Sequence, residues 1–148
     1  MKNYTYINVE ASQQKDNQIP TKSLSKRVKA RRKQIKAEAK EKLRRASFFN
    51  RTFKRAIKIT GSGIDEWLNQ PHKHYVEKNE MLLSIGEVIE RADYLGKSQY
   101  KGRVTHIFET VLCGELTWIV VTDVPGRGAT IHSISDSENI LKEIIKPV

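Results

Sequence analysis

Three strand-like segments joined by short connections occupy residues 103–134 of the 148-residue chain. The runs at 103–112, 116–122 and 129–134 are rich in β-branched and other apolar residues, and the first alternates apolar with more polar positions. The connections between them contain glycine and are typical of hairpins. The pattern predicts an antiparallel meander.

Helical segments precede this meander. Ser62 is expected to cap a short helix that continues through Leu68, and Pro71 fits the first position of the next helix. Capping-box patterns at residues 84–87 and 135–138 predict a third helix, to about residue 92, and a short C-terminal helix. Helices gathered before a meander indicate an α+β fold, with helices packed on a small antiparallel sheet.

Basic residues are concentrated in the N-terminal part of the chain. Residues 1–60 contain 18 Lys and Arg against 4 Asp and Glu, a surplus of +14, whereas residues 61–148 have a net charge of −4. This split predicts a basic arm with helices over residues 1–60 and a separate body over residues 61–148. A basic arm favours a polyanionic partner, because neutralised phosphates release counterions.

The segment 22–45 lacks Gly and Pro and is predicted to be helical. Its narrow apolar stripe consists of Leu24, Val28, Ile35, Ala39 and Leu43. Three interpretations remain open: a solvated helix lying on the body, a nucleic-acid-binding helix, or a helix for a membrane surface or partner protein. The candidate nucleic-acid contacts are Lys26, Arg27, Lys29, Arg31, Arg32, Lys33, Lys36, Arg44 and Arg45.

Two shorter segments flank this helix. The spacing of Phe49, Phe53 and Ile57 predicts a second helix, and the first twenty residues read as an arm with a β-like run at 4–9. The chain has one cysteine, no apolar run long enough to span a membrane and no signal-peptide pattern at its start, so a soluble intracellular protein is expected.

The stretch W-L-N-Q-P-H-K-H-Y-V-E-K-N-E at 67–80 is the most distinctive block. On a regular helix His72 and His74 point in nearly opposite directions, so no metal site and no cofactor are expected. His74 and Lys78, four residues apart, share one side of that helix and suit an anionic substrate.

Further candidates lie in the C-terminal half. His106 and Glu109 belong to the first strand-like run, and Ser135 ends the last one; a core histidine and a capping serine are the plainer alternatives. Trp67, Tyr75 and Trp118 suit base stacking or the core.

Four blocks, the one at 67–80 together with H-I-F-E, G-E-L-T-W-I-V-V and S-I-S-D-S, resemble the phage-associated barnase–EndoU–colicin–RelE-like nuclease domains. The resemblance covers residues 64–138. It implies helices packed on an antiparallel sheet and cleavage of RNA without a metal, by a histidine, a lysine or arginine, and a serine or threonine.

Carried onto this chain, the resemblance implies His74 as general acid or base and Lys78 as phosphate anchor. It implies His106 or Glu109 as a second acid or base and Ser135 as a donor to the phosphate, with His72 beneath the site. The expected function is a phage-type ribonuclease acting on RNA in the host cytoplasm or packaged in the virion. The alternative is a non-catalytic virion or nucleoprotein component that binds packaged DNA or phage structural proteins; no membrane partner is expected.

Overall fold

A computed structural model of the chain describes residues 25–100 and 103–144. The helices are α1 (Lys26–Lys42), α2 (Gly61–Asn69), α3 (Tyr75–Met81) and α4 (Ile85–Arg91), with the 3-10 turns η3 (Leu82–Ser84) and η4 (Glu138–Glu143). The strands are β1 (Ser47–Asn50), β2 (Arg55–Lys58), β3 (Asp93–Tyr100), β4 (Arg103–Leu112), β5 (Glu115–Val124) and β6 (Gly128–Ser135). The β-like run expected at residues 4–9 lies outside the described residues.

The strands form one six-stranded sheet in the order β1-β2-β6-β5-β4-β3. The meander expected from the sequence is present as β4, β5 and β6, and its strands pair antiparallel. The expected small antiparallel meander is only part of a larger sheet, because β3 extends one edge and the β1–β2 hairpin extends the other. The β2–β6 pairing is parallel, with Ile57 opposite Ala129.

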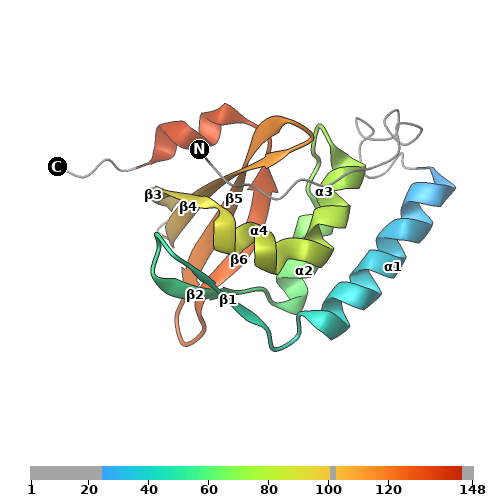
Figure 1. The fold of residues 1–148 in the computed structure, drawn as a ribbon, viewed down its shortest axis with the longest axis horizontal. Coiled ribbons are helices and arrows are strands. Elements are labelled where there is room, and N and C mark those ends of the chain that lie inside the picture. The colour runs from blue at the N-terminus through green and yellow to red at the C-terminus, as the bar shows by residue number, and fades with distance from the viewer. Residues whose placement is uncertain (1–24, 101–102, 145–148) are drawn as a thin grey trace.

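The two faces of the sheet differ in chemistry. Directly opposed residues share a face, and the pairs Phe108–Ile119 and Ile119–Ile134 belong to the main hydrophobic core. We call this the core face; α2, α3 and α4 lie between it and α1 (Figure 1). The opposite side, the outer face, carries Thr105 and Thr122 as a directly opposed pair.

Helix α1 packs on the rest of the protein through the predicted apolar stripe. Ser25 accepts a hydrogen bond from the backbone N–H of Val28 and caps the helix. Ile35, Ala39 and Leu43 are buried in the same core as the sheet and the other helices. Leu24, the first residue of the stripe, is outside the described residues. The boundary expected between residues 60 and 61 therefore falls within one shared core.

Residues 47–58 form a hairpin, and the helix predicted there is wrong. Asn50 decides the local structure, because its side-chain oxygen accepts hydrogen bonds from the backbone N–H groups of Thr52 and Phe53. Its amide donates to the carbonyls of Ile89 and Ala92 at the end of α4. A buried asparagine that holds a turn in this way outweighs a four-residue apolar spacing.

The helix expected to begin at Pro71 begins at Tyr75 instead. Pro71, His72 and Lys73 precede it as a non-helical segment, with His74 at the N-cap position. Two other predicted starts shift slightly: Thr60 rather than Ser62 caps α2, and η4 begins after residue 137. Helix α4 does start after residue 84, but no side-chain cap bond forms there because η3 runs directly into it. Among the described residues, no helix is long and apolar enough to cross a membrane.

Candidate functional site

His72 joins the segment before α3 to the end of the sheet. Its Nδ1 accepts a hydrogen bond from the backbone N–H of His74 at 2.9 Å, which leaves the ring proton on Nε2. Nε2 lies 3.0 Å from Thr117 Oγ1, whose hydroxyl donates to the carbonyl of Ser135 at 2.8 Å. Burial lowers the pKa of His72 to about 4, so the ring is neutral near pH 7.

His74 lies at the surface next to this chain of hydrogen bonds. Its Nε2 is 3.1 Å from Glu115 Oε1, and Lys73 Nζ is 2.6 Å from the other oxygen of that carboxylate. Hydrogen bonds from Lys73 and His74 lower the pKa of Glu115. His74, Glu77 and Cys113 form a group with metal-like spacing among the described residues.

Lys78 is fully buried, with 0% of its surface exposed, although the sequence predicted a phosphate anchor on the same side as His74. Its ammonium donates to the carbonyls of Trp67 and Gln70 at 2.5 and 2.9 Å, which satisfies carbonyls at the end of α2. The Trp67 indole N–H donates in return to the carbonyl of Lys78 at 2.8 Å. Burial and the nearby charge of Arg32 lower the pKa of Lys78 well below its usual value.

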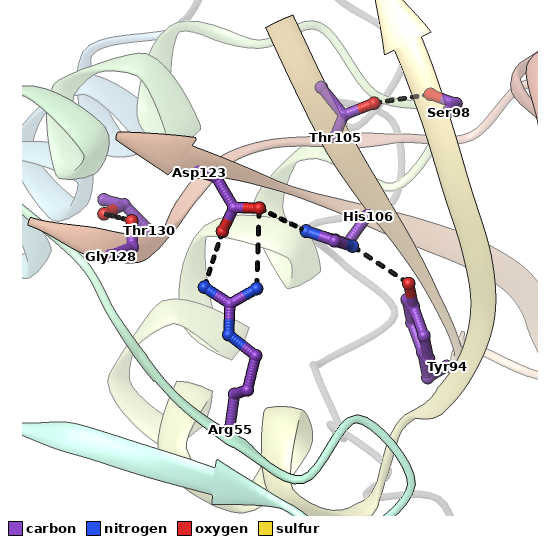
Figure 2. A network of polar contacts seen from close by, with 8 residues as sticks. All are labelled: Arg55, Tyr94, Ser98, Thr105, His106, Asp123, Gly128 and Thr130. Atoms are coloured by element: carbon purple, nitrogen blue, oxygen red, sulfur yellow. Dashed lines mark hydrogen bonds and ion pairs between the residues drawn. The ribbon is translucent and has the colours of Figure 1, made fainter. Parts of the chain in front are cut away.

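His106 is buried on the core face at the other end of the sheet (Figure 2). Its Nε2–H donates to Asp123 at 2.8 Å, so in the neutral ring Nδ1 accepts from the Tyr94 hydroxyl at 2.9 Å. Arg55 binds the other oxygen of Asp123 at 2.7 Å. Burial alone would raise the pKa of Asp123, but the hydrogen bonds from Arg55 and His106 lower it on balance. Burial raises the pKa of Tyr94.

The predicted site residues are therefore not brought together on one surface. The partners of His72 and His106, Thr117 and Asp123, are six residues apart on β5, which is roughly 20 Å at the rise of a strand. Glu109 lies on the outer face, where it is buried and accepts a hydrogen bond from the Trp118 indole.

The aromatic residues expected either to stack on bases or to form the core are all buried. They are Trp67, Tyr75 and Trp118.

A groove on the outer face brings together polar residues that the sequence analysis treated separately or passed over. It has a volume of about 800 Å³, and η4 forms part of its wall. Its polar lining consists of Ser98, Arg103, Thr105, Thr122, His132, Ser133, Ser135, Ser137 and Asn139. Of the predicted catalytic residues, Ser135 is the one that lines it. The described residues that line this groove include no carboxylate.

Hydroxyl groups cross the outer face in register. Ser98 on β3 opposes Thr105 on β4, Thr105 opposes Thr122 on β5, and Thr122 opposes Thr130 on β6. The hydroxyls of Ser98 and Thr105 are hydrogen-bonded to each other (Figure 2). All four residues are buried, and the hydroxyl of Thr130 donates to the carbonyl of Gly128, so the row lies at the base of the hollows rather than at their exposed rim.

His132 projects from an irregularity in the sheet. The β5–β6 register shifts between Val120, which opposes Ser133, and Val121, which opposes Ile131, so His132 has no opposed residue. Such bulges re-aim side chains and are common beside active sites. The sequence holds a signal for this bulge, because two polar residues separate Ile131 from Ile134 where strict alternation places one.

The groove continues past His132 into a second hollow of about 250 Å³. Arg103, Thr122 and His132 line both, and Arg127 lines the second. Arg103, Arg127 and His132 are exposed. Two guanidinium groups, an imidazole and the Glu66 carboxylate therefore accompany the row of hydroxyls across the two hollows.

The cations predicted for nucleic-acid contact, on α1 and just after it, divide into two sets. Arg31 binds Glu80 through two hydrogen bonds, Arg32 binds the side chain of Asn69, and Lys36 forms an ion pair with Asp65 at 3.0 Å. These three fasten α1 to the body. The others predicted for nucleic-acid contact are exposed: Lys26, Arg27, Lys29, Lys33, Arg44 and Arg45.

Replacement of Lys78 tests its structural role. Lys78→Ala removes a buried side chain and leaves carbonyls at the end of α2 without their donor, so we expect the free energy of unfolding to fall by roughly 2–5 kcal/mol. Lys73→Ala is the matched control, because this exposed lysine pairs only at the surface and its loss should change stability little. Equal effects of the two variants in urea unfolding would contradict the assignment.

The neutral state of His72 predicts a pH dependence of stability. The folded-state pKa of about 4 lies below the ordinary 6.5, so the unfolded chain binds a proton first as the pH falls. The contribution is present above pH 6.5 and is lost towards pH 4, by up to about 3 kcal/mol. His72→Gln cannot titrate, so the stability difference between wild type and variant should shrink across that window. A difference that stays constant with pH would refute this.

Comparison with known proteins gives one family. The large polyvalent protein-associated domain 3 family matches residues 26–113, more than half of the chain, from the start of α1 to the end of β4. No curated protein and no solved structure gives a significant match. The family's description names no reaction. The matched region extends across the boundary expected between residues 60 and 61. The chain belongs to the large polyvalent protein-associated domain 3 family, a phage-associated domain family.

Proposed function

We propose that this phage-associated protein binds RNA in the groove on the outer face of the sheet and cleaves it without a metal ion. The observation that carries the proposal is the lining of that groove, which combines Arg103, His132 and a row of hydroxyls, while the nearest lining carboxylate, Glu66, belongs to the adjoining hollow. Guanidinium and hydroxyl groups bind phosphate oxygens, and a carboxylate beside them would repel the same oxygens.

The chemistry follows from what RNA itself supplies. His132 takes the proton of the 2′-hydroxyl, and the 2′-oxygen then attacks the adjacent phosphorus. The bond from phosphorus to the 5′-oxygen breaks, and the departing oxygen takes a proton from water. The products are a 2′,3′-cyclic phosphate and a 5′-hydroxyl. Arg103 neutralises the charge that builds on the phosphate, and the hydroxyls of Ser133 and Ser135 donate to its oxygens.

This assignment keeps the reaction expected from the sequence and changes the residues. His132 replaces His74 and His106 because it is exposed in the groove, whereas His106 is 1% exposed and held between Asp123 and Tyr94. Arg103 replaces Lys78, because a fully buried ammonium cannot reach a phosphate.

The exposed basic face of α1 supports a second activity, non-specific nucleic-acid binding. Lys26, Lys29 and Lys33 are exposed on this helix. Helix α1 lies on the far side of α2 and α3 from the sheet (Figure 1), so this surface is separate from the groove. A non-catalytic role on packaged DNA or RNA requires this face and does not require His132.

Substitutions in the groove test the cleavage proposal. We expect His132→Ala to lower the rate of RNA cleavage in EDTA by about 10²–10⁴-fold, the usual effect of losing a positioned base. Arg103→Ala should weaken RNA binding and reduce the salt slope by about one. His74→Ala is the matched histidine control and should leave the rate unchanged.

Three outcomes decide between the alternatives. Full activity in His132→Ala would remove the groove as the reaction site. Cleavage of DNA at a similar rate would contradict attack by the 2′-hydroxyl. Binding of RNA by the wild type without any cleavage would favour the nucleoprotein role.

A charge substitution tests the α1 surface. In the variant with Lys26, Lys29 and Lys33 all changed to Gln, we expect the slope of log affinity against log salt to fall by about 2–3, in proportion to the phosphate contacts removed. A matched control changes Arg51, Arg91 and Lys97, which are exposed elsewhere on the molecule. Equal loss in both variants, measured by fluorescence anisotropy, would show that only net charge matters.

A further inference from the structure

Three metal-ligand side chains from two separate parts of the chain meet beside the β4–β5 turn. They are His74 at the N-cap of α3, Glu77 in the first turn of α3, and Cys113 in the turn itself. One ligand atom from each lies within 4.8 Å of the other two. A tetrahedral zinc ion, with ligands about 2.0–2.3 Å away, spaces its ligand atoms roughly 3.3–3.8 Å apart. Small side-chain rotations therefore close the site.

The donor types suit zinc. Imidazole nitrogen, thiolate sulfur and carboxylate oxygen are its usual protein ligands. The charges also balance, because a thiolate and a carboxylate together offset the two positive charges of the ion. Glu77 is 1% exposed, and its carboxylate is hydrogen-bonded to the Cys113 thiol. If that thiol ionised alone, two anionic groups would lie in contact at a poorly solvated position; a divalent cation removes that conflict.

The surroundings already hold the ligands in place. Cys113 has a positive φ of 54°, a conformation that non-glycine residues adopt rarely. With Gly114 at a φ of 76°, Cys113 forms the positive-φ pair of a two-residue hairpin turn, and its thiol lies near the ligand atoms of His74 and Glu77. A second carboxylate stands next to the group, since Glu115 Oε1 is 3.1 Å from His74 Nε2. It is in reach as a fourth ligand, or as an acceptor for the N–H of a zinc-bound imidazole.

We infer that His74, Glu77 and Cys113 form a zinc-binding site that ties the start of α3 to the β4–β5 turn. The site is separate from the groove on the outer face and does not depend on the proposed cleavage of RNA. No metal site was expected from the sequence, because His72 and His74 point in nearly opposite directions on a regular helix and the carboxylates and Cys113 are scattered along the chain. The inferred site uses only His74, and its partners come from Glu77 and from a cysteine 36 residues further along the chain.

A cysteine thiol is ordinarily protonated near neutral pH. Zinc ligation requires the thiolate. Each zinc ion bound should therefore release about one proton from Cys113. This release is a consequence of ligation that mere surface adsorption of zinc would not produce.

The test uses the full-length protein freed of metal by a chelator and then titrated with Zn²⁺ or Co²⁺. We expect one ion per chain, release of about one proton in calorimetry with buffers of different ionisation enthalpy, and a thiolate-to-Co²⁺ charge-transfer band. Cys113→Ser should abolish the band, and His74→Asn and Glu77→Gln should each weaken binding by at least about tenfold. His132→Asn, an exposed histidine on the outer face of the sheet, is the matched control and should bind as the wild type does.

Several results would overturn the site. No binding by the wild type, a charge-transfer band that persists in Cys113→Ser, or equal losses in His132→Asn and His74→Asn would each exclude it. Circular dichroism checks that every variant is folded. If Cys113→Ser does not fold, His74→Asn and Glu77→Gln decide the question alone, and unchanged affinity in both would exclude the site.

Discussion

The buried amino group of Lys78 holds the helical layer together at the point where α2 ends and α3 begins. It donates to the carbonyls of Trp67 and Gln70, while the Trp67 indole returns a hydrogen bond to the Lys78 carbonyl. Tyr75 adds its hydroxyl to the carbonyl of Leu68, and its ring lies 4.4 Å from the ammonium. An apolar residue at position 78 would leave these carbonyls unpaired in the core, where each unmade hydrogen bond is costly.

These hydrogen bonds between α2 and α3 also position the segment that connects the two helices. Helix α2 ends where Lys78 caps its last carbonyls, and the chain continues from Pro71 in a non-helical conformation. In this segment His72 reaches Thr117 at the end of the sheet. The start of α3 then lies beside the β4–β5 turn, which brings His74 and Glu77 to Cys113. The buried Lys78 amino group thus links the end of α2 to α3 at the point where the start of α3 lies beside the β4–β5 turn.

The groove depends on a different feature, the unequal faces of the sheet. The core face is closed by helices and by the β1–β2 hairpin, and it buries His106 as a partner of Asp123 and Tyr94. The outer face keeps its hydroxyl row, and the β6 bulge directs His132 towards the groove. Arg103, at the start of β4, brings a positive charge to the same place. These features favour phosphate binding on the outer face rather than on the core face.

The sequence by itself determined the elements whose pattern is local. Strands β4 to β6 follow from β-rich runs and their turns, α2 from its apolar spacing, and the packing of α1 from its stripe, because period and turn chemistry are short-range properties. The sequence did not predict the features that depend on contacts between residues far apart in the chain. Asn50 turns 47–58 into a hairpin by binding the end of α4, and burial makes Lys78 a helix cap. The exposure of His132, the burial of His106 and the meeting of Cys113 with α3 follow from strand register and helix packing. Only the tertiary structure decided these, because register and packing join residues that no sequence period relates.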